Sequence, residues 1–291
     1  MSVSARASRV AVYLRLIRFQ HTLFALPFAY AGMLLAAGGW PGWTTFVWVS
    51  LAMAGARTTA MALNRVIDAR IDALNPRTRT REIPAGQVAR RKALLLAALG
   101  FVVFSLSGWA LNPLTFALLP LATAFMVLYP YTKRFTWACH AVLGITIGAS
   151  AAGGWIAVTG SFDPIAWWLW LGVAAWIGGF DVVYALLDED FDRRHGVHSV
   201  PARFGALGAR RIAIGAHALA WLALAVAAWL DGFGLWGWLG LIAVGASFVH
   251  QHRLVAQRGA AEALRAFDAN LWVGVMVLVG VVLDLASRGG V

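Results

Sequence analysis

The sequence is poor in charge and nearly lacks cysteine. Only 13% of its 291 residues are charged, roughly half the share of a typical soluble domain. No side chain between Lys92 and Lys133 is charged, which leaves room for two membrane spans of about 20 residues each. The single cysteine, Cys139, excludes an intramolecular disulfide and a cysteine-based metal site. These absences exclude an ordinary soluble domain and a disulfide-stabilised one.

What the sequence has in abundance is apolar surface. Hydrophobic residues make up 60% of the chain, which includes 15 Trp, so we expect an all-α, polytopic membrane protein. The first apolar segment is long and lacks a small-residue cleavage site, so we expect no secretory signal peptide. The net charge of +11 is spread over short loops, so we expect no nucleic-acid partner. The tryptophans are typical of a belt at the membrane interface.

Apolar runs and the Gly, Pro and Asn residues between them predict nine transmembrane helices. We expect a single domain, residues 1–291. The predicted helices cover residues 20–38, 44–63, 92–110, 114–131, 138–158, 165–187, 212–230, 234–250 and 269–286.

The loops between these helices alternate sharply in charge. Eight basic residues lie between Arg65 and Lys92, whereas the loops that would lie on the opposite side carry none. By the positive-inside rule, the N-terminus is cytoplasmic. We therefore expect an integral protein of the bacterial inner membrane whose basic loops face the cytoplasm.

Two aspartate pairs with the same spacing follow apolar spans. Asp68 and Asp72 form one D-x-x-x-D motif, and Asp188 and Asp192 form the other. On a helix this spacing places both carboxylates on one face. Carboxylates gathered at the edge of a bilayer are costly unless a cation holds them, and Mg²⁺ bound to a diphosphate meets that need. The tandem motifs also suggest two related four-helix halves.

Basic residues continue the first motif. Arg77, Arg79 and Arg81 follow it directly and are suited to contact the phosphate oxygens of a metal–diphosphate. The alternative is a positive-inside loop in which acidic residues only offset basic ones.

The second motif has further polar residues before and within it. Asp181 precedes Asp188 by seven residues, with Tyr184 between them, so we expect a polar stripe facing a cavity. Glu189 and Asp190 fall off this stripe, and we expect them to be solvated.

Arg57 is the one basic residue within a predicted span, seven residues before Asn64 on the same face. An arginine inside the membrane is a functional-site candidate, here for the carboxylate of an aromatic acid. The alternative is a structural ion pair with Asp181 or another acid.

Three further cationic candidates lie at predicted helix ends. Lys133 and Arg134 follow Tyr129 by about one turn and are placed to reach a diphosphate or to extend to the lipid headgroups. His21 lies at the start of the first span, where it lines the site or lies at the interface.

These motifs resemble the UbiA superfamily of intramembrane prenyltransferases over essentially the whole chain. The resemblance rests on Asn64, Asp68 and Asp72, on Arg81 to Gly86, on Tyr129 to Lys133, on Asp181 to Asp192, and on Gly196 to Ser199. It implies a helical bundle around a central cavity that opens laterally to lipid. It also implies two Mg²⁺ ions, held by Asn64, Asp68, Asp72, Asp188 and Asp192.

The same resemblance implies roles for the cationic residues and a reaction. Arg81, Lys133 and Arg134 would neutralise the departing diphosphate, and Arg57 would position an aromatic acceptor. The expected reaction transfers a polyprenyl group to 4-hydroxybenzoate or to 1,4-dihydroxy-6-naphthoate in respiratory quinone biosynthesis. The Phe19 to Pro27 stretch leans towards the naphthoate. Many members carry Asn-Asp where this chain has Asn64-Arg65, which weakens the transfer of substrate identity.

Three alternatives remain open at this point. Haem, chlorophyllide or a lipid could be the acceptor, because relatives of this architecture prenylate them. A cation-coupled transporter would also carry intramembrane acids, although here the acids gather at one membrane face. A CDP-alcohol phosphotransferase is a third aspartate-rich membrane enzyme, but its D-G-x-x-A-R element is absent.

Overall fold

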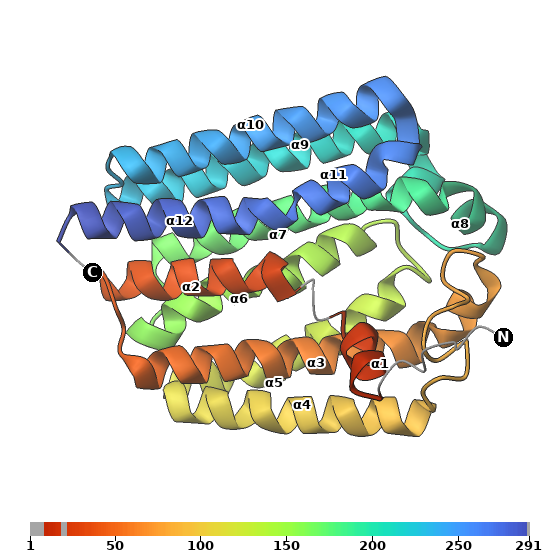
Figure 1. Ribbon diagram of the computed structural model, residues 1–291, viewed down its shortest axis with the longest axis horizontal. Helices are drawn as coiled ribbons and strands as arrows, with labels where there is room; N and C mark the ends of the chain where they lie inside the picture. The colour runs from red at the N-terminus through yellow and green to blue at the C-terminus, as the bar shows by residue number, and fades with distance from the viewer. Residues whose placement is uncertain (1–8, 19–21, 290–291) are drawn as a thin grey trace, which may run out of the picture.

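The computed structural model describes residues 9–18 and 22–289, which form helices and contain no strand. The helices run roughly parallel in one elongated bundle (Figure 1). The α-helices are α1 (Arg9–Leu16), α2 (Thr22–Ala37), α3 (Trp43–Leu74), α4 (Arg90–Leu111), α5 (Pro113–Thr132), α6 (Cys139–Thr159), α7 (Pro164–Ala185), α8 (Glu189–His195), α9 (Val200–Asp231), α10 (Leu235–Arg258), α11 (Ala263–Ala269) and α12 (Leu271–Ser287). Two 3-10 turns, η2 (Leu186–Asp188) and η3 (Gly259–Glu262), interrupt the chain.

Over the described residues, each of the nine predicted spans lies mostly on one helix, so the all-α class is confirmed. The count of nine spans is not. Within the described residues, seven helical segments are long and apolar enough to cross a membrane. Helix α2 is only 16 residues long, and the second half of α10 carries His250, Gln251, His252 and Arg253, which lower its hydropathy.

Two helices extend well beyond their predicted limits. Helix α3 continues from residue 63 to Leu74, so the first aspartate motif lies within it. Helix α9 begins at Val200 rather than at the predicted residue 212. The Ser199 side chain caps this start by accepting a hydrogen bond from the Ala202 N–H. Gly205 then kinks α9 with a φ of 68°. The predicted helices were too short because hydropathy does not detect polar turns at the end of a helix.

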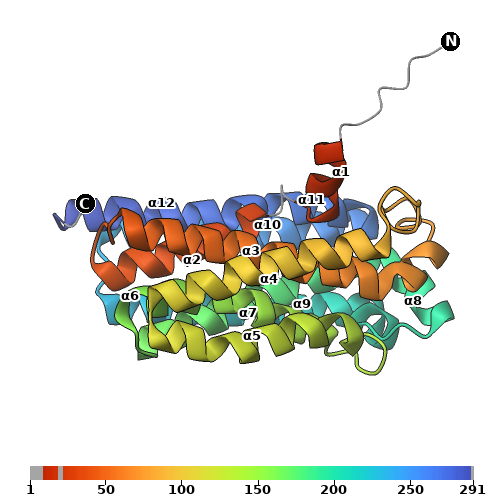
Figure 2. The same cartoon turned by 90° about the horizontal axis from the view of Figure 1, so that it is seen from below.

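One helix pair packs alike in the two predicted four-helix halves. Helix α3 packs along α4 in the first half, and α7 packs along α9 in the second. Helices α2 and α6 join the halves, and Figure 2 shows the bundle from a second side, with α1 projecting from it. The first two helices of each half differ, since α6 packs along α7 whereas α2 has few contacts with α3, so the internal repeat stays a prediction.

Helix α3 approaches α4 closely at two glycines. A Cβ atom on Gly55 would lie 2.7 Å from the Gly100 carbonyl oxygen, so neither position accommodates a side chain. The Thr59 hydroxyl donates to the Gly55 carbonyl at 2.9 Å and to the Ala97 carbonyl at 3.2 Å. This contact fixes α3, and therefore the first motif, against the bundle.

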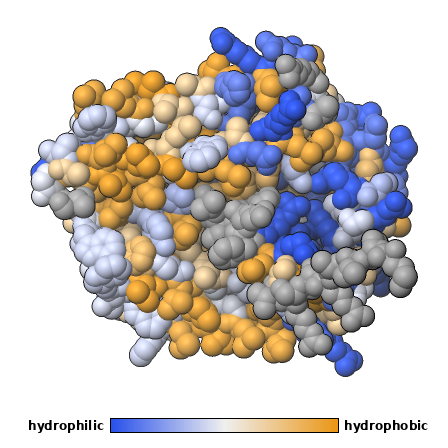
Figure 3. All heavy atoms as spheres, viewed as in Figure 1, coloured by the Kyte–Doolittle hydropathy of each residue, from blue (hydrophilic) through white to orange (hydrophobic). Residues whose placement is uncertain are grey.

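Polar and apolar surfaces separate along the bundle. Hydrophilic side chains gather at the end that carries α8 and the loop between α3 and α4, whereas apolar side chains cover most of the rest (Figure 3). Leu95, Leu99 and Trp109 of α4 are more than half exposed, as expected for a surface that faces lipid. The polar end is therefore where a water-soluble headgroup can enter.

Candidate active site

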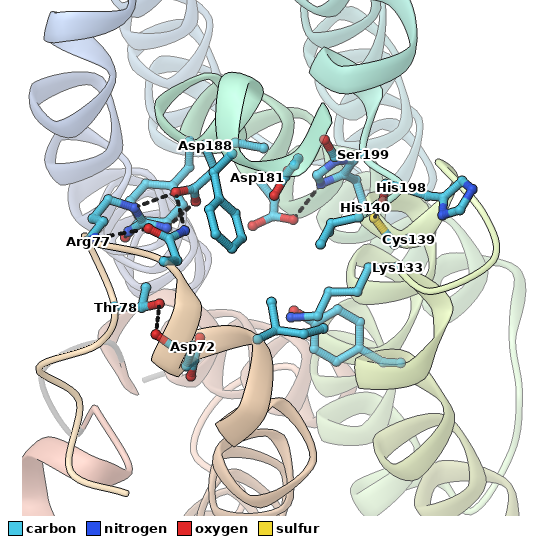
Figure 4. Close-up of a pocket in the computed structure, with 18 of the residues that line it drawn as sticks. Asp72, Arg77, Thr78, Lys133, Cys139, His140, Asp181, Asp188, His198 and Ser199 are labelled. Atoms are coloured by element: carbon cyan, nitrogen blue, oxygen red, sulfur yellow. Dashed lines mark hydrogen bonds and ion pairs between the residues drawn. The ribbon is translucent and has the colours of Figure 1, made fainter. Parts of the chain in front are cut away.

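A polar cavity of about 140 Å³ lies at this end of the bundle (Figure 4). Its lining comes from α3, the α3–α4 loop, the end of α5, α6, α7, η2, α8 and the loop before α9. Its polar lining consists of Asp72, Asn75, Arg77, Thr78, Arg81, Tyr129, Lys133, Cys139, His140, Asp181, Tyr184, Asp188, Asp192, His198 and Ser199. Residues from both halves of the chain therefore share one site.

The first motif is buried and paired with cations. Asp68 is 1% exposed and accepts a hydrogen bond from Lys133 Nζ at 2.5 Å, while Arg134 lies 3.5 Å from its other oxygen. Asp72 Oδ1 accepts from Arg81 Nη1 at 2.7 Å. Its Oδ2 is buried without a hydrogen-bond partner among the described residues, and a buried carboxylate oxygen without a donor calls for a cation.

The second motif is not on one helix, so that prediction was wrong. Helix α7 ends at Ala185, the η2 turn follows, and Asp188 has a non-helical φ of −112° and ψ of 3° at the start of α8. The break turns the Asp188 carboxylate towards the α3–α4 loop. Asn75 Nδ2 donates to Asp188 Oδ1 at 2.9 Å, so a residue 113 positions away holds this conformation.

Arg77 connects the α3–α4 loop to the second motif. Its Nε donates to Asp188 Oδ1 at 2.8 Å and its Nη2 donates to Asp188 Oδ2, a bidentate pair. Its Nη1 donates to the Tyr184 hydroxyl at 2.5 Å. Burial alone would lower the pKa of Arg77, but the hydrogen bonds and charges of Asp188 and Tyr184 raise it above its ordinary value. Arg77 is thus a permanent cation beside the cavity.

The rest of the second motif divides as predicted. Asp192 is buried and lines the cavity. Asp190 is exposed, and Glu189 forms an ion pair with the exposed Arg193 at 2.7 Å. Neither lines the cavity; the expected solvation is confirmed for Asp190, whereas Glu189 is only partly exposed.

Asp181 lines the cavity, but with an unpredicted partner. Its Oδ2 lies 2.6 Å from Nδ1 of His140 on α6. His140 Nε2 accepts from the Val200 N–H at 3.2 Å. The proposed alternative, an ion pair between Asp181 and Arg57, is therefore wrong.

A second, apolar cavity of about 530 Å³ adjoins the polar one. It is enclosed by α2 to α7, and Tyr129 lines both cavities. Arg57 and Asn64 line this apolar cavity. Arg57 Nη2 donates to the Arg18 carbonyl at 3.1 Å, and its Nε is buried with no partner among the described residues.

Most predicted site residues converge, and a few do not. Asp72, Arg81, Tyr129, Lys133, Asp181, Tyr184, Asp188 and Asp192 line the polar cavity. Arg57 and Asn64 line the apolar one, whereas Asp68 and Arg134 lie behind Lys133 and line neither. His21 lies outside the described residues. Asn75 and His140 were not predicted as site residues. Asn75 precedes a proline in a polar loop, and His140 is a lone histidine at the start of an apolar run, which gives no signal of a site.

The donor set fits Mg²⁺, although the described residues contain no group of three His, Cys, Asp or Glu side chains close enough to hold a metal. Mg²⁺ needs only one or two carboxylates when phosphate oxygens and waters complete its shell. Asp72, Asp188 and Asp192 line the cavity, and Asp72 Oδ2 lacks a donor. Carboxylate oxygens on both sides of a small cavity match that requirement.

Comparison with known proteins decides the family. The sequence model of the UbiA prenyltransferase family matches residues 25–274, well over half of the chain. The chain belongs to the UbiA prenyltransferase family. It is an integral membrane enzyme of the prenyltransferase class.

Individual members of the UbiA family match over most of their length. The 4-hydroxybenzoate octaprenyltransferase of Alkalilimnicola ehrlichii is 36% identical over 89% of this chain and 88% of its own. That of Aromatoleum aromaticum is 34% identical over 97% and 96%.

Solved structures of UbiA proteins share the fold. A UbiA homologue from Aeropyrum pernix superposes with a TM-score of 0.84 at 31% identity, covering 91% of this chain and 98% of that one. A UbiA homologue from Archaeoglobus fulgidus, bound to GPP and Mg²⁺, has a TM-score of 0.67 at 18% identity and covers 92% and 99%.

Proposed function

We propose that this enzyme transfers a polyprenyl group from a polyprenyl diphosphate to 4-hydroxybenzoate and that the reaction depends on Mg²⁺. The observation that carries the proposal is the junction of the two cavities at Tyr129. A polyprenyl diphosphate joins a charged headgroup to an apolar chain, so its binding site needs a polar cavity that meets an apolar one. The curated relatives named 4-hydroxybenzoate octaprenyltransferase support the choice of acceptor.

The polar cavity is suited to a metal–diphosphate. Asp72, Asp188 and Asp192 would hold Mg²⁺ from the two motifs, and Asn64 and Asp68 lie next to this set on α3. When bound, Mg²⁺ supplies positive charge that stabilises the departing diphosphate. Arg77, Arg81 and Lys133 line the same cavity and add cationic donors for phosphate oxygens.

The apolar cavity is suited to the isoprenoid chain. Val49 and Asn64 both line it and lie 15 residues apart on α3, about 22 Å along the helix. Its walls are almost entirely apolar side chains, among them Met53, Phe104 and Phe125. These walls keep water from the allylic carbon when its bond to the diphosphate breaks.

Arg57 is placed to bind the carboxylate of the acceptor. It lines the apolar cavity on the same helix face as Asn64, and its Nε has no partner within the described part of the chain. A buried guanidinium donor gains most from a charged oxygen. We expect Arg57→Gln to raise the KM for the aromatic acid by about tenfold or more, with little change in the KM for the prenyl diphosphate.

The orientation and extent of the site are part of the proposal. The basic loops lie at the same end of the bundle as the polar cavity, so the mouth would face the cytoplasm from the inner membrane. Residues 1–291 would act as one domain. A cysteine introduced by Arg79→Cys should then react with an impermeant maleimide in inverted vesicles and not in right-side-out vesicles.

A paired turnover assay tests the substrate. Purified enzyme in detergent receives Mg²⁺ and a long-chain prenyl diphosphate, with 4-hydroxybenzoate in one vial and 1,4-dihydroxy-6-naphthoate in the other. Mass spectrometry should detect the prenylated product in the first vial. Product in the second vial alone would replace the proposed acceptor with the naphthoate of menaquinone biosynthesis. Product in neither vial, from folded enzyme, would overturn the proposed function.

A further inference from the structure

His140 is a buried histidine on α6 that contacts two other elements of the active site. It lies at the start of α6, is 6% exposed, and lines the polar cavity. One ring nitrogen contacts Asp181 on α7, and the other contacts the backbone of Val200 at the start of α9. It is absent from the set of residues that would hold Mg²⁺ or diphosphate. Its role in the reaction is therefore unassigned.

The contact with α9 fixes the tautomer of His140. Val200 N–H donates to Nε2 at 3.2 Å, so Nε2 accepts and carries no hydrogen in this arrangement. Nδ1 therefore carries the proton and donates it to Asp181 Oδ2 at 2.6 Å. Because the start of α9 is itself capped by Ser199, the imidazole has one orientation, and it passes this orientation to the Asp181 carboxylate.

The carboxylate that His140 holds differs from its neighbours. Asp72 and Asp188 are each paired with an arginine, whereas the described partner of Asp181 is a histidine. Its side chain is 24% exposed, and within the described part of the chain only Oδ2 makes a hydrogen bond. Figure 4 shows this carboxylate pointing into the cavity, across from Lys133.

We propose that His140 is a positioning residue that holds Asp181 as the acceptor of the proton lost from the aromatic ring, an inference that rests on the proposed function. The bond between the allylic carbon and the diphosphate oxygen breaks, and its electron pair leaves with the diphosphate. A ring carbon forms the new bond to the allylic carbon. The proton on that ring carbon then passes to Asp181 Oδ1, and its bonding electrons restore the aromatic ring.

Three variants separate positioning from packing. His140→Leu introduces an apolar side chain of similar bulk and removes both hydrogen bonds. His140→Gln restores them, because its amide both donates and accepts. Asp181→Asn keeps an oxygen that accepts from His140 but offers no base. His250, an exposed histidine on α10, supplies the matched control His250→Ala.

The readout is kcat with acceptor deuterated at the ring positions ortho to the hydroxyl, compared with ordinary acceptor. Asp181→Asn should lower kcat by about 10²-fold or more, with little change in the KM for the prenyl diphosphate. Loss of the ring proton then limits the rate, so a primary isotope effect absent from wild type should appear. His140→Leu should show a smaller loss with the same isotope effect, and His140→Gln should retain most of kcat.

Several outcomes would overturn the proposal while leaving the proposed function intact. One is wild-type transfer with no isotope effect in Asp181→Asn or His140→Leu. Another is equal loss of kcat in His140→Leu and His140→Gln, which would mark His140 as a packing residue. If His140→Leu does not fold, Asp181→Asn tests the proton acceptor by the isotope effect, and a His140→Gln variant that folds but loses kcat as strongly as Asp181→Asn would overturn the positioning role. Failure of wild type to prenylate any aromatic acid would instead overturn the proposed function.

Discussion

Asp68 and Asp72 lie on consecutive turns of the unbroken helix α3, whereas Asp188 and Asp192 lie on either side of the start of α8. The spacing in the sequence is the same, but the backbone is not. The first motif is buried and pairs with partly exposed cations, and Asp188 is held by Arg77 at a more exposed position. Identical spacing therefore does not imply identical geometry.

The difference follows from where the partners of each motif lie. Lys133 and Arg134, from the end of α5, hold Asp68 against an intact helix. Asn75 and Arg77, from the loop directly after the first motif, draw Asp188 out of helical geometry. The loop after the first motif thus supplies the residues that shape the second motif, and the site is complete only when both halves are folded together.

Removal of the metal should have the largest effect and should affect both motifs alike. EDTA should abolish turnover, and Mg²⁺ should restore it, because Asp72 from the first motif and Asp188 and Asp192 from the second line the same polar cavity. Mg²⁺ with prenyl diphosphate should also raise the Tm of wild type. The free energy of unfolding should rise by up to about 2.7 kcal/mol when the prenyl diphosphate concentration is 100 times its Kd. Full turnover in the presence of excess EDTA would contradict the metal requirement.

Removal of one carboxylate distinguishes the cavity-facing positions from the exposed one. Asp72→Asn should lower kcat by about 10²–10³-fold, because it removes charge from the only buried carboxylate oxygen in the described cavity that lacks a donor. Asp190→Asn is the matched control within motif two, and since Asp190 is exposed it should leave turnover unchanged. Measurements of kcat on both purified variants check this prediction. An equal loss of kcat in Asp72→Asn and Asp190→Asn would contradict a special role for the cavity-facing carboxylate.

Loss of the arginine that joins the motifs should have an intermediate effect. Arg77→Gln should raise the KM for the prenyl diphosphate by about 10-fold or more, because a charge-assisted hydrogen bond contributes roughly 1.5–3 kcal/mol. Arg77→Lys should recover only part of it, since lysine cannot form the bidentate contact. Arg79, which is exposed and outside the cavity, is the control. A similar change in Arg79→Gln would indicate a general charge effect.

A carboxylate held by neutral donors at the other end of the bundle should show the smallest effect. Hydrogen bonds from Trp155 and then Ser161 lower the pKa of Asp163 below its ordinary value of 3.8. Its contribution to stability is therefore present above the unfolded-state pKa and is lost as pH falls through the lower folded-state pKa. Thermal unfolding should show a small deficit for Asp163→Asn at neutral pH that shrinks in acid.

The helices could largely be predicted because lipid demands apolar runs of defined length. Their ends could not, since α3 and α9 continue into polar turns that hydropathy treats as loop. The aspartates, Arg81 and Lys133 were identified because charges beside apolar spans are costly and therefore informative. His140 was missed because it carries no such signal, and the break at η2 because it depends on Asn75, 113 residues away.

The most direct test of the account is to measure diphosphate release and prenylated product in the same reaction. Purified enzyme would be given Mg²⁺, polyprenyl diphosphate and 4-hydroxybenzoate, and the two products would be quantified together. The account predicts one prenylated aromatic acid for each diphosphate released, and neither when Mg²⁺ is chelated. Release of diphosphate without a prenylated aromatic product, or transfer that continues without Mg²⁺, would contradict it.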